Sequence, residues 1–410
     1  MKLLYNFAIG CYRTAVSIAG HFNKKAQKLS HGESNALKQL QANIHPDGNY
    51  IWIHAASLGE FEQGRPLIET LRAKCPNQRI LLTFFSPSGY EVRKNYDGVD
   101  YVSYLPFDRS CNVRKFLDIV KPRQAIFVKY EFWYNYLHEL RQRNIPTYLI
   151  SSIFRKEQIF FKPYGGMFRS MLRCFTHLYV QDKSSLELLS QIGINNATIA
   201  GDTRFDRVIT IHQQAREVPL IEQLTNGHFS IVAGSSWQPD EELFIRYFNS
   251  HPELRLVIAP HEIHEEHLAS IEAQLSRPHL RLSQANETNI AQVDCLIIDS
   301  FGLLSSIYRY GQVAYIGGGF GAGIHNCLEA SVYGIPVIFG TNYKKFREAR
   351  EMLTAQCAFS IENYQQLEKL LDYLTSHPHY LEKTGRTAHN YVHNNAGATN
   401  IIYNDLFNIK

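Results

Sequence analysis

Short apolar runs alternate with longer amphipathic stretches from residue 51 onward, which is the pattern of strands separated by helices. The clearest helical stretches of the first half are 64–74 and 132–143. Parallel strands are joined by such helical crossovers, which are right-handed, so the first half predicts a parallel α/β sheet. Its strands are expected at 51–54, 80–84, 101–105, 124–128, 147–151, 178–180 and 197–200.

The same alternation restarts in the second half. Strands are expected there at 230–233, 256–259, 296–298, 313–316 and 337–339. The polar stretches 31–49 and 212–228 indicate connections. The expected fold class is α/β, with two Rossmann-like domains whose parallel sheets face a central cleft. The expected division is a helix over 1–30, an N-terminal domain over 31–210, a linker over 211–228 and a C-terminal domain over 229–410, whose last helices are free to pack back on the N-terminal domain.

The first residues predict an amphipathic helix. One face carries the apolar residues Leu4, Phe7, Cys11, Ala15, Ile18 and Phe22, and the cations Lys24, Lys25 and Lys28 follow. Asn6 and Arg13 make the segment a poor spanning helix. Two interpretations stay open: a helix that lies in the surface of an anionic membrane, and a helix that packs on its own domain or on a partner subunit.

Composition narrows the class of protein. Hydrophobic residues are 45% and charged residues 20% of the 410, as in soluble globular chains. A net charge of +4 is too small to indicate a nucleic-acid partner. The seven cysteines form no close pairs of the zinc or redox kind, and we expect no metal site. His261, His264 and His267 resemble zinc spacing, but the glutamates between them favour a solvated helix face.

Three charged residues follow strands of the first half, where ligands of open α/β sheets bind. Glu60 ends the run His54-Ala-Ala-Ser-Leu-Gly-Glu60, before a helix expected to begin near Gln63. The helix dipole favours an ionised carboxylate there, which suits a general base acting on an alcohol. Glu131 and Arg204 follow later strands. The alternatives are that Glu60 only caps its helix and that the other two form surface ion pairs.

Two glycine-containing segments of the second half suit an anionic ligand. Gly234-Ser-Ser236 forms an expected turn after a strand, and the glycines of 317–323 are expected to open a helix carrying Asn326 and Glu329 on one face. Backbone amides toward a phosphate and a carboxylate toward a ribose suit a nucleotide. The alternative is that the glycines only permit tight packing. The segment is no G-x-G-x-x-G motif and no Asp-x-Asp occurs, which disfavours a nicotinamide dehydrogenase and a metal-dependent sugar transferase.

Together, the segments 51–60, 131–133, 201–206, 317–329 and 334–337 resemble the 3-deoxy-D-manno-octulosonic acid (Kdo) transferases of Gram-negative bacteria. The resemblance implies a GT-B fold, with an acceptor-binding N-terminal domain and a CMP-sugar-binding C-terminal domain. It implies inverting transfer of Kdo from CMP-Kdo to a hydroxyl of the lipid A precursor in lipopolysaccharide biosynthesis, without a metal or other cofactor. It also implies a peripheral or monotopic location at the cytoplasmic face of the inner membrane.

The resemblance also implies residue roles. Glu60 matches the family's general base, and Glu131 and Arg204 match positions that stabilise the transition state. Arg204 stands where the family usually has lysine, His261 where it commonly has arginine, and Phe301-Gly-Leu303 where it has Met-Gly-Glu. The positions that match the family's CMP-Kdo contacts are Ser235, Ser236, Pro260, His261, Phe301, Gly302, Leu303, Gly321, Gly323, Asn326, Cys327, Leu328 and Glu329. The alternatives are a GT-B sugar-nucleotide epimerase and a non-catalytic, membrane-associated nucleotide-binding scaffold.

Overall fold

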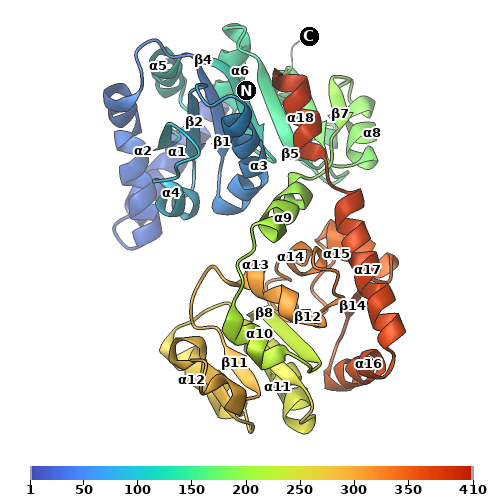
Figure 1. Cartoon of the computed structure of the whole chain (residues 1–410). Coiled ribbons are helices and arrows are strands. Elements are labelled where there is room, and N and C mark those ends of the chain that lie inside the picture. Colours follow the sequence, from blue (N-terminus) through green and yellow to red (C-terminus); the bar gives the residue numbers. More distant parts are fainter. Residues whose placement is uncertain (1, 408–410) are drawn as a thin grey trace. The chain divides into compact units, whose positions relative to one another are not determined.

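The computed structural model describes residues 2–407 and divides into two compact units (Figure 1). Unit 1 is Met1–Arg207 with Ala396–Lys410, and unit 2 is Val208–Asn395. The expected end segments, 1–30 and 229–410, include residues 1 and 408–410, which lie outside the described part of the chain. The final helix, α18 (Ala398–Phe407), belongs to unit 1.

Unit 1 is built on a parallel seven-stranded sheet with the order β3-β2-β1-β4-β5-β6-β7. The strands are β1 (Tyr50–Ala55), β2 (Ile80–Phe84), β3 (Tyr101–Tyr104), β4 (Pro122–Val128), β5 (Thr147–Ser152), β6 (His177–Val180) and β7 (Ala197–Ile199). The helices before α18 are α1 (Lys2–Ala19), α2 (Lys24–Asn43), α3 (Leu58–Lys74), α4 (Pro87–Arg93), α5 (Ser110–Val120), α6 (Tyr134–Gln142), α7 (Gly166–Leu172) and α8 (Lys183–Gln191).

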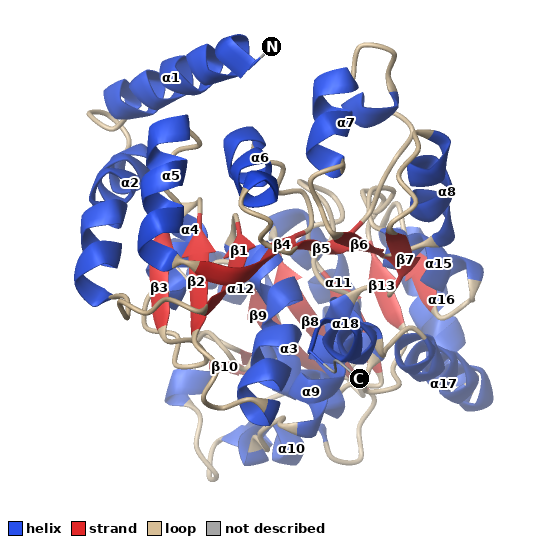
Figure 2. Ribbon diagram, turned by 90° about the horizontal axis from the view of Figure 1, so that it is seen from above, coloured by secondary structure: helices blue, strands red, loops and turns tan. Residues whose placement is uncertain are grey.

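Helices cover both faces of this sheet, which is why its central strands are mostly apolar and buried on both sides. Trp52 of β1 packs in one core cluster with residues of α5 and α6. Ile51 and Ile53 point to the other face, in a cluster with residues of α3 and α18. Figure 2 shows these two helix pairs on opposite sides of β1. The sheet thereby brings the carboxyl ends of β1 and β4 side by side at one edge.

Unit 2 holds a second parallel seven-stranded sheet, with the order β10-β11-β9-β8-β12-β13-β14. The strands are β8 (Ser230–Ser236), β9 (Arg255–Pro260), β10 (His279–Arg281), β11 (Cys295–Ile297), β12 (Val313–Ile316), β13 (Val337–Phe339) and β14 (Ala358–Ser360). After α9 (Thr203–Gln213), which spans the unit boundary, the helices are α10 (Pro219–Thr225), α11 (Gln238–Ser250), α12 (Glu265–Gln274), α13 (Leu304–Ile307), α14 (Leu328–Ser331), α15 (Arg347–Thr354), α16 (Tyr364–Ser376) and α17 (Pro378–Asn394).

Both expected connections contain helices. Residues 31–43 lie in α2, which begins after Asn23, whose side chain accepts hydrogen bonds from two backbone amides. The buried residues of α2, Leu29, Glu33, Ala36 and Leu40, follow a helical spacing that the polar residues between them hide. The expected linker contains α10 and the last turn of α9. The three-residue strands β10 and β14 were also not predicted.

The N-terminal helix packs on its own unit and still leaves its apolar face uncovered. Among Lys2–Ala19 only Val16 is buried, and Tyr5 donates a hydrogen bond of 2.6 Å to Asp108. The exposed apolar side chains nearby are those of Leu3, Leu4, Phe7, Ile18 and Phe22. Between residues 2 and 407, no helix is both long and apolar enough to cross a membrane.

Candidate active site

Glu60 lies in the first turn of α3, next to the carboxyl end of β1. The helix begins at Leu58, earlier than the position expected from the sequence. The Glu60 Oε2 atom accepts a hydrogen bond of 2.7 Å from the Ala56 backbone amide. This contact turns the carboxylate back over the end of the strand. Glu60 therefore bonds to the chain before its helix and not to a helix amide, and it stands at the sheet edge where ligands bind.

Glu131 follows β4 and is only 7% exposed, so it is no surface ion pair. Its Oε2 atom accepts a hydrogen bond of 2.7 Å from Trp133 Nε1 and lies 2.9 Å from His54 Nε2. His54 is fully buried in β1, and its Nδ1 atom lies 2.9 Å from Thr83 Oγ1. Sequence reasoning missed this role of His54, although a histidine within the apolar run Ile51-Trp-Ile-His-Ala55 was the available indication.

Burial and, to a lesser extent, the negative charge of Glu131 raise the pKa of Glu60 to about 7. The Ala56 amide, His54 and Lys129 act in the opposite direction. The expectation that the helix dipole keeps Glu60 ionised was therefore incomplete, because burial and a like charge outweigh it. A carboxylate that titrates near neutral pH is well matched to accepting a proton from an alcohol.

This pKa predicts a pH-dependent stability. A carboxyl group whose pKa is raised on folding stabilises the folded state fully below about pH 4.5, and this contribution is lost as the pH rises through about 7. We expect Glu60→Gln to raise the free energy of unfolding at about pH 8 by on the order of 1–3 kcal/mol, and to change it little at about pH 5. Urea unfolding of the wild type and of the variant at both pH values measures this difference in the free energy of unfolding. Equal effects at both would contradict a raised pKa.

Arg204 lies in the first turn of α9 and pairs with a buried carboxylate. Its Nη2 and Nε atoms lie 2.7 and 2.9 Å from Asp202 Oδ2. The adjacent Thr203 hydroxyl donates to the Gln63 carbonyl of α3 and contacts Ser151 of β5 at 2.8 Å. The first turn of α9, which carries Arg204, is thus fixed to α3, the helix that carries Glu60. Burial raises the pKa of Tyr130, beside Glu131, and the charges of Glu60 and Arg204 are among those that act on it.

In unit 2, the expected turn at 234–236 is part of strand β8. Ser235 has a positive φ of 53°, and the Ser236 hydroxyl donates a hydrogen bond of 2.7 Å to the buried Glu241. The second oxygen of Glu241 lies 3.0 Å from His267 Nε2. His267 therefore does not lie on the solvated helix face that the sequence favoured. His261 and His264 are not on that helix at all, because α12 begins at Glu265. Within residues 2–407, no three His, Cys, Asp or Glu side chains are grouped as a metal site.

The glycine-rich segment packs tightly against two other backbone segments. A Cβ atom at Gly317 would lie 2.1 Å from the Ser235 oxygen, and one at Gly319 would lie 2.4 Å from the Gly340 nitrogen. The packing explanation therefore holds for these two positions. Gly321 is exposed, with no neighbour closer than 3.9 Å to such an atom, and Gly323 has a φ of 127°. Packing does not explain the glycine at position 321.

The helix expected to begin near Gly323 begins only at Leu328 and is four residues long. Asn326 Nδ2 donates a hydrogen bond of 2.9 Å to Glu329 Oε1, so the two side chains do lie together. Cys327 and Leu328 are fully buried, which leaves their side chains no access to a ligand. A contact from these two residues would have to come from the backbone.

Three aromatic side chains lie together in unit 2: Trp237 directly after β8, His261 directly after β9, and His325 in the loop that follows β12. The rings of Trp237 and His261 stack with centroids 4.6 Å apart, and those of His261 and His325 are 4.5 Å apart. Trp237 Nε1 donates to His325 Nε2 at 3.3 Å. Burial and His261 lower the pKa of His325 to about 4, which keeps its ring neutral. Sequence reasoning missed Trp237 and His325, since neither follows a recognised spacing.

The other expected donor contacts lie at strand ends of the same unit. Pro260 closes β9 and is buried. Phe301 is exposed after β11, Gly302 has a φ of 90°, and Leu303 is the residue before α13. Each of these positions therefore lies at the end of a strand of the unit 2 sheet or after it, as expected for ligand contacts in an α/β fold.

Residues 23–207 match the model of a protein family described as 3-deoxy-D-manno-octulosonic-acid transferase (kdotransferase). The 3-deoxy-D-manno-octulosonic acid transferase of Aquifex aeolicus is 28% identical over 334 residues, which are 80% of this chain and 86% of that protein. The transferase of the same name from Rickettsia prowazekii is 27% identical over 406 residues, 96% of this chain and 87% of that protein. These matches show that the chain is similar to the Kdo transferases, with the family model covering residues 23–207.

The Kdo transferase family model covers the segment that contains Glu60, Glu131 and Arg204. A solved UDP-GlcNAc 2-epimerase from Neisseria meningitidis has the same architecture, with a TM-score of 0.60 over 88% of this chain and all of that chain. Its identity is 15%, so the likeness concerns the fold alone. The expected α/β class with two parallel sheets and a GT-B-like fold is confirmed.

Proposed function

We propose that this protein is a Kdo transferase that moves Kdo from CMP-Kdo to a hydroxyl of the lipid A precursor, in lipopolysaccharide core biosynthesis. The matching family model and the similar transferases support the donor and the reaction. The observation that carries the chemistry is the Glu60 carboxylate, whose pKa is about 7, at the edge of the unit 1 sheet. A base that is about half ionised near neutral pH can take a proton from an alcohol and release it afterwards.

In this mechanism, the acceptor hydroxyl oxygen attacks the anomeric carbon of Kdo while its proton passes to Glu60. The bond between that carbon and the phosphate oxygen breaks, and CMP leaves with the electron pair. Attack from the face opposite to CMP inverts the configuration. Glu131, held by His54 and Trp133, stabilises positive charge that develops on the sugar. Arg204 carries the cation that meets the donor carboxylate or the leaving phosphate.

We assign the CMP contacts to unit 2. Asn326 and Glu329, joined by their hydrogen bond, offer a paired amide and carboxylate to the nucleoside hydroxyls. Backbone groups near Ser235, Gly321 and Gly323 suit the phosphate, because glycine and positive φ values let the chain approach a ligand closely. His261 takes part in a ring stack, so we assign it a packing contact where the family commonly has arginine.

We further propose that α1 places the protein at the cytoplasmic face of the inner membrane. The exposed apolar residues of α1 and the lysines at 24, 25 and 28 support this arrangement. We expect Leu4→Glu, at a side chain that is 71% exposed, to weaken binding to anionic vesicles by about tenfold. The matched control is Tyr164→Glu, at a unit 1 side chain that is 75% exposed. Vesicle flotation measures both, and equal losses would contradict a specific role of α1.

A transfer assay tests the proposed function. Purified protein is incubated with CMP-Kdo and a lipid A precursor, and the lipid product is weighed by mass spectrometry. An increase by one or more Kdo masses is expected. Conversion of the free sugar nucleotide without a lipid product would favour an epimerase. Binding of CMP without any turnover would favour a scaffold, and either result would overturn the proposal.

A further inference from the structure

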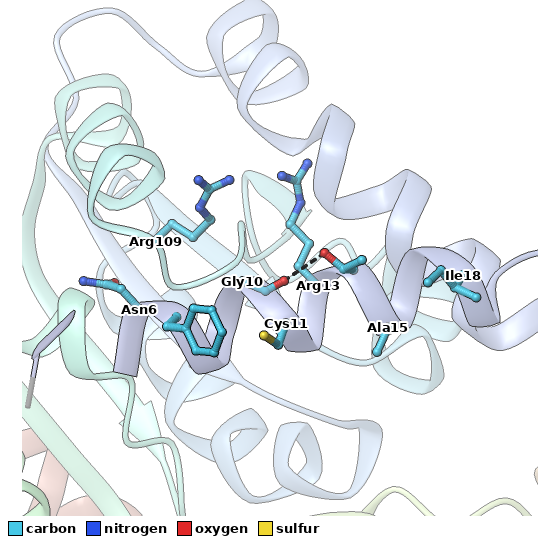
Figure 3. A pocket seen from close by; sticks show the side chains of 9 residues that line it. Asn6, Gly10, Cys11, Arg13, Ala15, Ile18 and Arg109 are labelled. Atoms are coloured by element: carbon cyan, nitrogen blue, oxygen red, sulfur yellow. Dashed lines mark hydrogen bonds between the residues drawn. The ribbon is translucent and has the colours of Figure 1, made fainter. Parts of the chain in front are cut away.

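A groove of about 710 Å³ runs along α1 and ends against Arg109, the residue before α5 (Figure 3). Its lining combines two kinds of side chain. Phe7, Cys11, Ala15 and Ile18 give it an apolar side, and Arg13 and Arg109 give it a cationic side. In Figure 3 the two guanidinium groups extend to the same side of α1. The groove therefore offers positive charge beside an apolar surface.

Positive charge is in excess at this groove. The buried Glu33 accepts a hydrogen bond of 2.9 Å from the Phe107 amide, and Arg13 Nε lies 3.7 Å from its other oxygen. Burial raises the pKa of Glu33, while Arg13 and Arg109 both lower it, so both cations act on this one carboxyl group. Within residues 2–407, the guanidinium group of Arg109 forms no hydrogen bond and no ion pair. One of the two cations is thus available to an external anion.

The apolar side of the groove continues onto solvent-exposed surface. Phe7 is 70% exposed and Ile18 is 59% exposed, and both line the groove. Phosphate esters are bound by arginine through charge-assisted hydrogen bonds, and acyl chains are bound by apolar surface. A groove that offers both, side by side, suits a lipid whose phosphate ester lies close to its acyl chains.

The same helix is connected to the catalytic carboxylates of unit 1. The Tyr5 hydroxyl donates to Asp108 and accepts from the Tyr134 amide at 3.3 Å. The Tyr12 ring lies 6.4 Å from that of Phe85, which in turn lies 4.8 Å from the ring of Trp133. Trp133 donates to Glu131. A lipid in the groove would therefore lie on the side of unit 1 where the acceptor hydroxyl reacts, which favours the acceptor over bulk membrane lipid.

We propose that this groove binds a phosphate ester of the acylated acceptor, with Arg109 and Arg13 at the phosphate oxygens and the apolar face of α1 along an acyl chain. The assignment rests on the proposed function, because it takes the substrate that is glycosylated to be an acylated lipid. The groove then selects acceptors by the phosphate they carry and turns their sugar toward Glu60.

Steady-state kinetics with two acceptors test this assignment. One is a phosphorylated lipid A precursor, and the other is the same lipid after enzymatic removal of its phosphates. We expect Arg109→Gln to raise KM for the phosphorylated acceptor by about tenfold, with kcat changed by less than about twofold, and to leave KM for the dephosphorylated acceptor unchanged. Arg109→Lys should recover part of the loss, because it keeps the charge without the paired donors.

The matched control is Arg114→Gln, which removes an exposed cation of α5, the helix that Arg109 precedes, and does not line the groove. Equal KM increases in the Arg109 and Arg114 variants, or an equal increase with both acceptors, would overturn the assignment. If Arg109→Gln weakens binding to phosphatidylglycerol vesicles as much as it weakens binding of the phosphorylated acceptor, the groove binds bulk lipid instead, and the assignment is overturned.

A binding measurement separates failure of this assignment from failure of the proposed function. Calorimetry in detergent micelles measures the affinity of the wild type and of Arg109→Gln for the phosphorylated precursor without any turnover. Tighter binding by the wild type is expected even if no sugar is transferred. Equal affinities would overturn the groove assignment, even if the wild type proves to be an active transferase.

Discussion

Glu60→Gln is expected to lower kcat for sugar transfer by about 10²–10⁴-fold, while the protein keeps its fold and its affinity for CMP-Kdo. The amide keeps nearly the same shape, and its oxygen can still accept from the Ala56 amide as Glu60 does. It cannot take a proton from the attacking hydroxyl at neutral pH. The loss should therefore appear in kcat, because proton transfer contributes to the transition state and not to donor binding.

Glu60→Asp serves as the control, because it retains a carboxylate but shortens its reach, and an intermediate rate is expected. In the wild type, the rate should rise with pH through an apparent pKa of about 7, because only the ionised carboxylate acts as a base. The Gln variant should lose this limb. A Gln variant that transfers sugar at close to the wild-type rate, with the limb intact, would exclude Glu60 as the base.

Gly317→Ala is expected to destabilise unit 2 by about 3 kcal/mol or more, which is severe for a single methyl group. The added carbon would meet the Ser235 oxygen at 2.1 Å and the Ser236 Cα atom at 2.5 Å. Both are backbone atoms of strand β8 and cannot rotate away. Separating them requires moving β8 or the turn after β12, which a closely packed interior resists. Urea unfolding monitored by tryptophan fluorescence measures the loss, because Trp237 directly follows β8.

Gly321→Ala is the matched control, since it adds the same atom in the same turn where the nearest neighbour is 3.9 Å away. Its unfolding free energy should stay within about 0.5 kcal/mol of the wild type. If the two alanine variants unfold alike, the close approach of the turn to β8 is not what requires glycine at position 317.

The central strands of both sheets could be predicted because they are buried on two faces and so read as continuous apolar runs. The edge strands β10 and β14 could not, because neither is a continuous apolar run: β10 carries His279 and Arg281 around one leucine, and β14 ends at Ser360. Helix α2 was missed for a related reason. Its buried stripe includes Glu33, whose burial depends on the Phe107 amide from a distant part of the chain.

The sequence placed Glu60 and Glu131 at strand ends, and the pairing of β1 with β4 brings those ends together. The charge state of Glu60 could not be predicted, since it depends on burial and on the distance to Glu131. The role of His54 depends on Thr83 and Glu131, from two other strands. Composition alone could not show whether the glycines of 317–323 allow a ligand to approach or only allow backbone packing. The close approach of Ser235 to Gly317 and of Gly340 to Gly319 shows that packing requires glycine at these two positions.

The return of the last helix to unit 1 has a consequence for how the protein is made. Helix α18 buries Ile402, Tyr403 and Leu406 in the core cluster that contains residues of α3. Asp206 accepts hydrogen bonds from the Gly397 and Thr399 amides, which fixes the returning segment beside α9. The ribosome completes the whole of unit 2 before it releases these residues. Unit 1 is therefore completed only after unit 2 has been made, and until α18 is released unit 1 exposes the apolar surface that α18 will cover.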